Sequence, residues 1–377
     1  MKVQLLDLAS QYRKIRKEVM AEVKRVCDSQ HYVLGKNVSG LEEEIAAYCG
    51  AKFAVGVASG SDAILLALMA AGVGRGDKVI TTPFTFFATA GSIARLGAIP
   101  LFVDIDPKTY NIDPDALTAA LKRNSKTVKA VIPVHLYGQC ADMGPVNAIS
   151  KKYKIAVIED AAQSIGAEYR GRRAGSIGDM GCLSFYPTKN LGCFGDGGMV
   201  TTNSEKLARR VKMLRVHGSM VRYYHDEVGA NSRLDELQAA ILRVKLRHLG
   251  PWTEGRIRNA GRYDSIFKKA GLSGLVATPY IREGNLSVFN QYVVRVKKRD
   301  ELRRYLAGLG VGTEVYYPLC LHQQKCFKYL GYRKGDFPAS EAAAKEVLAL
   351  PIYPELKPVE QRYVVESIAA FYGSGRP

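Results

Sequence analysis

The sequence predicts an α/β fold: a large domain with a mostly parallel central sheet flanked by helices, followed by a smaller C-terminal α/β domain. The main observation is that short apolar runs alternate with amphipathic segments between residues 53 and 159, which is typical of strands joined by covering helices. The second is length, because 377 residues exceed what one hydrophobic core usually holds. The content of 47% hydrophobic and 24% charged residues is that of an ordinary folded protein.

The expected elements follow in chain order. A short apolar piece at residues 3–8 precedes a charged amphipathic segment at 12–27. Strands are then expected at 53–57, 78–81, 99–103, 130–134 and 155–159, and helices at 62–71, 87–96, 114–121 and 144–153. A further strand at 181–185 leads into a glycine-rich stretch. Ligands of such sheets bind beyond the carboxyl ends of the strands, so functional side chains are expected directly after each strand.

The formal net charge of +18 is the most unusual feature of the composition. The lysines and arginines are spread along the chain, with some enrichment at 206–269, and this spread argues against a dedicated nucleic-acid-binding arm. We interpret the charge as a field that favours anionic ligands, and we expect no nucleic-acid partner.

Cysteine usage and the absence of targeting segments predict a cytoplasmic protein. Seven cysteines at irregular spacings are typical of reduced thiols. Cys320 and Cys326 flank His322, but this spacing fits no usual zinc pattern and no second ligand pair follows, so no metal site is expected. No secretory signal is visible and no apolar run is long enough to span a bilayer, so no membrane partner is expected either.

A lysine between a serine and a run of glycines is the strongest local signal. Lys189 lies in the stretch from Ser184 to Gly198, directly after the strand at 181–185. An amine that is held still, desolvated and near other cationic groups has a lowered pKa, and a neutral amine forms a Schiff base with an aldehyde. Lys189 is therefore a candidate covalent anchor for a carbonyl cofactor. The alternative is a surface lysine in a glycine-rich turn.

Three other strand ends carry candidate binding residues. Asp160 follows an apolar strand, where an unpaired carboxylate is costly to bury, so this side chain needs a partner. Gly60 and Ser61 open a helix whose free N–H groups and dipole would hold a phosphate, with an ordinary N-cap by Ser61 as the alternative. Phe86 would lie flat against a planar ring, with core packing as the alternative.

Pyridoxal phosphate would give each of these residues a chemical partner. Its aldehyde would bond to Lys189, and Asp160 would keep its ring nitrogen protonated, which makes the ring an electron sink for a carbanion beside the imine. Gln163, three residues after Asp160, would reach the ring hydroxyl. The remaining predicted contacts are Phe86 on the ring face and Gly60, Ser61 and Ser184 at the phosphate.

Several long motifs occur together along the chain. They are Gly-Ser-Asp-Ala at 60–63, Glu-Asp-Ala-Ala-Gln at 159–163, Ser-Phe-Tyr-Pro-Thr-Lys-Asn-Leu-Gly at 184–192, Gly-Asp-Gly-Gly at 195–198, and Gly-Ala-Asn-Ser-Arg-Leu-Asp-Glu-Leu-Gln-Ala-Ala at 229–240. In these motifs and their order, the chain resembles the DegT/DnrJ/EryC1/StrS family of pyridoxal-phosphate-dependent nucleotide-sugar aminotransferases over nearly its whole length. The resemblance implies the fold-type I aminotransferase architecture and a homodimer with active sites at the subunit interface.

The resemblance also implies roles for individual residues. Lys189 would be the Schiff-base lysine, and Asp160 would pair with the pyridine nitrogen. Asn231 looks like the family's asparagine that reaches the phosphate from the neighbouring subunit, whereas the residues alone would make it a helix N-cap. Arg233 would meet an anionic group of the sugar nucleotide or of the amino donor.

One departure from the family concerns substrate contacts. Members often carry His-Tyr-Pro where this chain has Tyr316, Tyr317 and Pro318. Tyr317 keeps the place of the family tyrosine, whereas Tyr316 replaces a titratable imidazole with a phenol that is neutral at physiological pH. His135, after the strand at 130–134, and His225 are further candidates for substrate contact, with a structural or solvated role as the alternative for each.

The activity implied by the resemblance is transfer of an amino group from L-glutamate to a keto group of a nucleoside-diphosphate sugar, in surface-polysaccharide or deoxyaminosugar biosynthesis. Similarity at 224–246 favours a 3-keto sugar, either a UDP-linked uronic acid or a deoxythymidine-diphosphate-linked deoxysugar. One alternative is a sugar dehydratase, found in relatives with histidine in place of the lysine, and Lys189 argues against it. The other is a non-catalytic basic regulator that binds nucleic acid, and the intact site argues against that.

The sequence also suggests where the chain divides. The stretch Leu249-Gly250-Pro251 indicates a large cofactor-binding domain at 1–250 and a small domain at 251–377. Family members often complete the small domain with N-terminal residues, so the start of this chain is expected to pack there.

Overall fold

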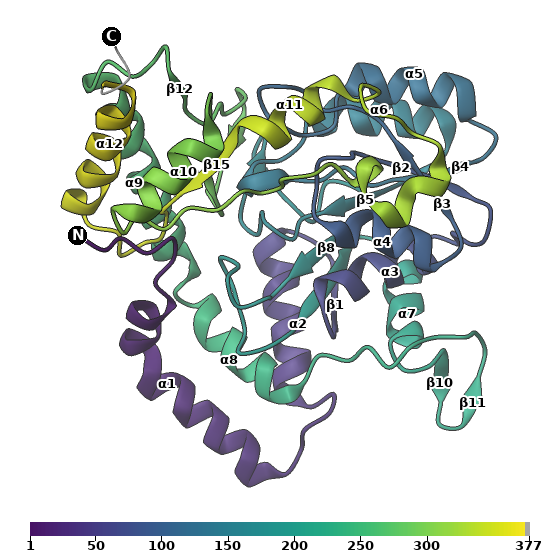
Figure 1. The fold of residues 1–377 in the computed structure, drawn as a ribbon. Helices are drawn as coiled ribbons and strands as arrows, with labels where there is room; N and C mark the ends of the chain where they lie inside the picture. The colour runs from purple at the N-terminus through teal and green to yellow at the C-terminus, as the bar shows by residue number, and fades with distance from the viewer. Residues whose placement is uncertain (374–377) are drawn as a thin grey trace.

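The computed structural model describes residues 1–373 and has a mostly parallel sheet at its centre (Figure 1). Within these residues the central sheet has seven strands. In spatial order they are β1 Phe53–Val57, β9 Gly198–Thr202, β8 Met180–Ser184, β5 Ala156–Asp160, β4 Val128–Val131, β2 Lys78–Thr81 and β3 Ile99–Phe102. Strands β8, β5, β4, β2 and β3 pair in parallel, and β9 runs antiparallel to β1 and β8. The predicted α/β fold with a mostly parallel sheet is confirmed.

Helices cover both faces of this sheet. On one face lie α3 Gly60–Ala70, α4 Phe87–Arg95 and α7 Glu205–Leu214, and on the other lie α2 Lys36–Cys49, α5 Pro114–Asn124, α6 Met143–Tyr153 and α8 Glu236–Leu246. Neighbouring residues of β5 alternate between the two cores, with Ile158 in the first and Val157 in the second. Helix α1 Leu8–Ser29 packs on α8 through Ile15 and Val244.

The C-terminal part forms a second layered unit. Its elements are α9 Leu249–Lys269, β12 Val276–Ala277, β14 Tyr292–Val296, α10 Arg299–Gly308, α11 Pro338–Glu346, β15 Val347–Leu350 and α12 Pro358–Gly373. Strands β12, β14 and β15 make a three-stranded sheet, and Val294 and Leu348 lie in its core. Val3 pairs in parallel with Val311 and lies in the same core, so the N-terminal residues do pack on this part (Figure 1). The boundary at residue 250, which falls in the first turn of α9, stays a prediction.

Several short elements complete the structure. They are the three-stranded sheet of β13 Asn285–Leu286, β6 Glu168–Tyr169 and β7 Arg172–Arg173, the hairpin of β10 Ser219–Val221 and β11 Tyr224–His225, and the 3-10 turns η1 Leu136–Gly138, η2 Leu321–Gln323 and η3 Lys325–Leu330. The hairpin projects from the end of α7, away from the C-terminal part (Figure 1). Among residues 1–373, no helix is both long and apolar enough to cross a bilayer.

The predicted elements agree with the structure to within a few residues in most places. The strands expected at 53–57 and 78–81 match β1 and β2. The strand expected at 130–134 is wrong in its position, because β4 covers Val128–Val131. Pro133 has no backbone N–H, so the expected strand could not form a complete ladder there.

Candidate active site

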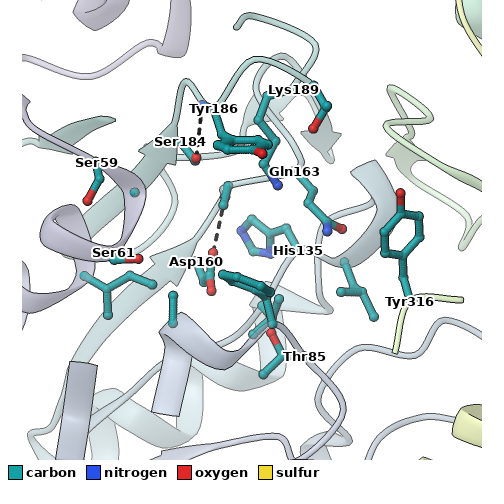
Figure 2. Close-up of a pocket in the computed structure, with 18 of the residues that line it drawn as sticks. Ser59, Ser61, Thr85, His135, Asp160, Gln163, Ser184, Tyr186, Lys189 and Tyr316 are labelled. Atoms are coloured by element: carbon teal, nitrogen blue, oxygen red, sulfur yellow. Dashed lines mark hydrogen bonds between the residues drawn. The ribbon is translucent and has the colours of Figure 1, made fainter. Parts of the chain in front are cut away.

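A cavity of about 490 Å³ lies at the carboxyl ends of the central strands (Figure 2). Loops that follow different strands supply its walls, as expected for a parallel sheet. The predicted site residues that line it are Gly60, Ser61, Phe86, His135, Asp160, Gln163, Ser184, Lys189, Tyr316 and Tyr317. The fold therefore brings together residues that are up to 257 positions apart in the sequence, counting from Gly60 to Tyr317.

Lys189 is half-buried in the loop after β8, and its backbone N–H donates to the Tyr186 carbonyl over 2.9 Å. Burial lowers the pKa of Lys189 to about 8, while the Asp160 carboxylate opposes this shift. The expected contribution of neighbouring cations is therefore wrong, because the charged neighbour is an anion. A pKa of about 8 leaves an appreciable fraction of the amine neutral at physiological pH, which bond formation to a carbonyl requires.

Asp160 is the last residue of β5 and is 5% exposed. Its Oδ2 accepts a hydrogen bond from Thr89 Oγ1 over 2.7 Å, and its Oδ1 accepts a longer one from the Ala162 N–H over 3.3 Å. The partner that the sequence required is therefore a threonine on α4, which the sequence analysis missed. Oδ1 keeps capacity for a further donor, such as a protonated ring nitrogen.

Gln163 joins two parts of the cavity wall. Its Oε1 accepts from the Tyr137 N–H over 2.7 Å, and its Nε2 donates to the Tyr317 hydroxyl over 3.2 Å. Burial and the Asp160 carboxylate raise the pKa of Tyr317, so its phenol stays protonated. Gln163 and Tyr317 thus form one polar edge of the cavity, from the large sheet and the C-terminal part respectively. The contact of Gln163 with a ring hydroxyl stays a prediction.

The start of α3 lies at the cavity, next to Ser184. Ser59 is the N-cap, because its side chain accepts from the Asp62 N–H over 3.1 Å, so the alternative of Ser61 as the cap is wrong. A Cβ atom placed on Gly60 would lie 2.6 Å from the Ser184 Cβ, and only glycine permits this approach. The helix N-terminus, which favours negative charge, therefore lies directly against the Ser184 side chain.

Phe86 lies at the mouth of the cavity, just before α4, and is 56% exposed. Its ring centroid is 6.0 Å from that of Tyr317, with the planes tilted by 40°. Exposure of so large an apolar ring beside a cavity is what a ring-stacking role requires, and core packing does not explain it. Stacking on a cofactor stays a prediction.

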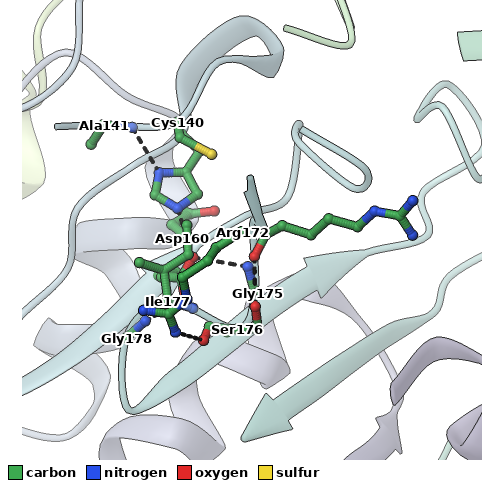
Figure 3. A network of polar contacts seen from close by, with 12 residues as sticks. Cys140, Ala141, Asp160, Arg172, Gly175, Ser176, Ile177 and Gly178 are labelled. Atoms are coloured by element: carbon green, nitrogen blue, oxygen red, sulfur yellow. Dashed lines mark hydrogen bonds and ion pairs between the residues drawn. The ribbon is translucent and has the colours of Figure 1, made fainter. Parts of the chain in front are cut away.

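His135 lines the cavity but is fully buried, and it belongs to a polar network that includes Ala141, Gly175 and Gly178, which Figure 3 labels. Its Nδ1 accepts from the Ala141 N–H over 3.1 Å, so its proton lies on Nε2, which donates to Glu159 over 2.8 Å. Both ring nitrogens are therefore used within the protein. The structural alternative for His135 fits this geometry better than a polar contact with substrate.

Glu159 is the anion at the centre of this network. Its carboxylate also accepts from the N–H groups of Gly175, Ile177 and Gly178 over 2.7–2.8 Å. Burial raises the pKa of Glu159, but His135 and the backbone donors outweigh burial and lower the pKa below its usual value. Glu159 thus fixes the loop at 175–178 and the orientation of the His135 ring.

Three predicted site residues lie outside the cavity: Asn231, expected at the cofactor phosphate, and Arg233 and His225, expected to contact substrate. Asn231 and Arg233 line a separate groove of about 490 Å³, which shares Asp196 with the cavity. The N-cap alternative for Asn231 is wrong, because α8 begins at Glu236 and Asn231 instead pairs with Val216. His225 lies on the hairpin, where its Nδ1 is 2.9 Å from the His217 carbonyl oxygen.

Sequence reasoning missed some residues that line or support the cavity. Thr89 and Tyr137 hold Asp160 and Gln163, and Gln291 lines the wall with a buried Oε1 that has no hydrogen-bond partner among the described residues. Helical spacing offered no signal here, because Thr85 precedes α4 whereas Thr89 lies within it.

The residues present fit pyridoxal phosphate. The cavity offers an amine with a lowered pKa, a carboxylate with one less engaged oxygen, and a helix N-terminus kept open by Gly60. These groups match an aldehyde, a ring nitrogen and a phosphate respectively. Among residues 1–373, no cluster of three or more side chains suited to a metal ion occurs.

Comparison with known proteins identifies relatives along nearly the whole chain. The sequence profile of the DegT/DnrJ/EryC1/StrS aminotransferase family matches residues 13–369. A pleiotropic regulatory protein of Geobacillus stearothermophilus is 54% identical over 99% of this chain and 99% of its own length. A UDP-2-acetamido-2-deoxy-3-oxo-D-glucuronate aminotransferase of Pseudomonas aeruginosa is 44% identical over 94% of this chain and 96% of its own.

Solved structures show the same fold. DesV of S. venezuelae, solved in complex with a ketimine intermediate, is 40% identical and superposes with a TM-score of 0.94 over 100% of this chain and 99% of its own. NtdA of Bacillus subtilis, solved with bound cofactor PMP, is 31% identical, with a TM-score of 0.87 over 98% of this chain and 82% of its own. The predicted aminotransferase architecture and the predicted cofactor are confirmed. The chain therefore belongs to the DegT/DnrJ/EryC1/StrS aminotransferase family, and its cofactor is pyridoxal phosphate.

Proposed function

We propose that this enzyme moves an amino group from L-glutamate to the 3-keto group of a nucleoside-diphosphate-linked sugar. The observation that carries the proposal is the Lys189 amine, whose pKa is about 8 in a cavity that it shares with Asp160. The name of the Pseudomonas aeruginosa relative supports a 3-keto sugar as the acceptor. The donor would leave as its 2-keto acid and the acceptor as an amino sugar for surface polysaccharides or deoxyaminosugars, so nitrogen and charge balance over the two half-reactions.

The residues of the cavity would have separate roles in the proposed reaction. Bound pyridoxal phosphate would supply the carbonyl that takes up the amino group and the ring that withdraws electrons from the donor's α-carbon. Lys189 would anchor that carbonyl and, once released as a free amine, carry the proton from the α-carbon. Asp160 Oδ1 would accept a hydrogen bond from the protonated ring nitrogen. Gly60 and Ser184 would bind the phosphate at the start of α3.

The pKa of Lys189 sets a pH dependence that can be measured. We predict that apoprotein captures pyridoxal phosphate faster as the pH rises towards about 8, and that the rate then levels off. The reason is that the neutral amine is the nucleophile, and its fraction rises about tenfold per pH unit below the pKa. Stopped-flow absorbance at the visible band measures the rate. A rate that climbs steadily to the ordinary lysine value of 10.5 would refute the lowered pKa.

The charges around the cavity favour a homodimer with shared active sites. The charged residues that line the cavity are Lys189, Asp160 and Asp196, so the free cations needed by a diphosphate and two carboxylates must come from elsewhere. Arg233 and Asn231 lie in the adjoining groove, and the hairpin exposes large apolar side chains such as Tyr224, which is 73% exposed. A second copy of the chain, presenting these residues to the cavity, would supply what one chain lacks.

Mixing two defective variants tests this arrangement. Lys189→Ala damages the cavity of its own chain, whereas Asn231→Asp would place a negative charge against the phosphate bound in the partner's cavity. We predict that each variant alone is inactive, and that unfolding and refolding them together restores about a quarter of the wild-type activity, because half of the dimers then hold one intact site. Absence of recovery in mixed dimers, verified by differential tags, would contradict sites that are shared between subunits.

The acceptor is tested by direct assay. We expect the enzyme, loaded with amino groups by L-glutamate, to aminate a UDP-linked 3-keto uronic acid, detected as a new amine by mass spectrometry. A deoxythymidine-diphosphate-linked 3-keto deoxysugar is the matched alternative, and the corresponding 4-keto sugar is the control. Preference for the 4-keto sugar would overturn the proposed position of amination.

A non-catalytic regulator is the second candidate function, favoured by the name of the Geobacillus stearothermophilus relative and by the net charge of +18. The presence of Lys189, Asp160, Gln163 and Ser184 in one cavity supports catalysis instead. If regulation were the function, Lys189→Ala would leave it intact, and the purified wild-type protein would turn over no keto sugar.

A further inference from the structure

The carboxylate of Asp160 is held by a chain of two buried hydroxyl groups. Thr89 Oγ1 lies 2.7 Å from Asp160 Oδ2, and Thr85 Oγ1 lies 3.0 Å from Thr89 Oγ1. Thr89 is fully buried in the first turn of α4, and Thr85 is 2% exposed. Neither threonine has a role in the function proposed above.

The direction of these hydrogen bonds follows from the chemistry of the groups. An ionised carboxylate only accepts, so the single hydroxyl proton of Thr89 goes to Asp160. Thr89 then has no proton left for Thr85, and Thr85 must be the donor in that pair. The chain therefore runs from Thr85 through Thr89 to Asp160, with each hydroxyl group polarised towards the carboxylate.

The two oxygens of Asp160 are consequently unequal. Oδ2 accepts a short hydrogen bond from Thr89, whereas Oδ1, within residues 1–373, has only the 3.3 Å contact with the Ala162 N–H. A hydrogen bond to the ionised form of a carboxylate stabilises that form. Thr89 thus orients the carboxylate and donates to it as an ionised acceptor, which is the form that pairs with a protonated ring nitrogen.

We propose that Thr89 is a positioning residue for the cofactor: it turns Oδ1 of Asp160 towards the ring nitrogen and keeps the proton on that nitrogen. The inference deepens the proposed function but rests on the cofactor site alone, so neither the acceptor sugar nor the amino donor enters its test.

The test combines isosteric variants with two cofactors. Thr89→Val removes the hydroxyl group and keeps the shape, Thr89→Ser keeps the hydroxyl group, and Thr85→Val makes the same change one step further from Asp160. Each purified protein is loaded with pyridoxal phosphate or with an analogue in which CH replaces the ring nitrogen, and the dissociation constants are measured. The ring ¹⁵N chemical shift of labelled cofactor on the holoenzyme reports whether the nitrogen is protonated.

We expect Thr89→Val to weaken pyridoxal phosphate binding about 10- to 100-fold, because a hydrogen bond to a charged group is lost, and to move the ¹⁵N signal towards the unprotonated position. Binding of the CH analogue should change less than about threefold, Thr89→Ser should restore wild-type values, and Thr85→Val should have a smaller effect. Equal weakening of both cofactors, or an unchanged ¹⁵N signal, would overturn the proposal. Should Thr89→Val fail to fold, Thr89→Ala compared with Thr89→Ser gives the same contrast.

Discussion

Replacing Lys189 with alanine is expected to slow amino transfer by at least about 10⁴-fold, because the variant loses both the covalent anchor and the group that carries the α-proton. Folding should be retained, since the side chain is half-buried at a cavity. Rapid mixing of the loaded enzyme with L-glutamate measures the first half-reaction, and the thermal midpoint reports folding. Turnover near the wild-type rate would remove Lys189 from the reaction.

Lys245 offers a matched control for this variant. Burial also lowers the pKa of Lys245 to about 8, but its amine donates to the Gly192 carbonyl over 2.5 Å and lies 4.8 Å from the centre of the Phe194 ring. Lys245→Met should therefore reduce stability while costing less than about tenfold in the half-reaction. Comparing the two variants separates the role of Lys189 in the reaction from the general effect of removing a buried lysine.

Replacing Glu159 with alanine is expected to have the largest effect on stability. The change leaves three backbone N–H groups and the His135 Nε2–H without an acceptor in a fully buried site, at a cost of about 3–5 kcal/mol. Thermal and denaturant midpoints of the holoenzyme measure the loss.

Because the pKa of Glu159 is lowered in the folded protein, the stability that Glu159 gives to the fold is complete above the usual pKa of 4.5 and is lost as the pH falls through the pKa of the folded state. The difference between wild type and variant should shrink in acid.

Glu168 is the matched control for Glu159. Its carboxylate is partly exposed and lies 3.6 Å from Arg173, so Glu168→Ala should change stability by less than about 1 kcal/mol. Similar losses in the two variants would mean that the network around His135 and Glu159 is not what holds the loop at 175–178.

The sequence predicted the fold and the centre of the site for the same physical reason. Alternating strands and helices place strand ends at one edge of a sheet, so residues chosen for following strands, such as Gly60 and Asp160, had to lie close together. Lys189 was identified because it lies between a serine and a run of glycines directly after an expected strand, and because the residues at other strand ends supported the same cofactor. These inferences depend on chain order and on local patterns, both of which a sequence contains.

Side-chain contacts between elements that are far apart in the chain could not be predicted from the sequence in this way. The partner of Asp160 is Thr89, on a helix 71 positions away, and its hydroxyl group looks the same in sequence as any helical threonine. His135 follows a strand end like the functional residues, but its ring is held by Glu159 and Ala141. The roles proposed for Asn231 and Arg233 would require a second chain, which a single sequence does not display, and the two residues lie in a groove that adjoins the cavity at Asp196.

The absorption spectrum of the purified protein, recorded before and after addition of L-glutamate, tests the central claim most directly. We predict a visible band from the cofactor bound to Lys189, and its replacement by the shorter-wavelength band of the pyridoxamine form when the donor is added. The Lys189→Ala variant should lack this conversion on the same timescale. No visible band after loading with pyridoxal phosphate, or a band that L-glutamate leaves unchanged, would contradict the proposed donor half-reaction.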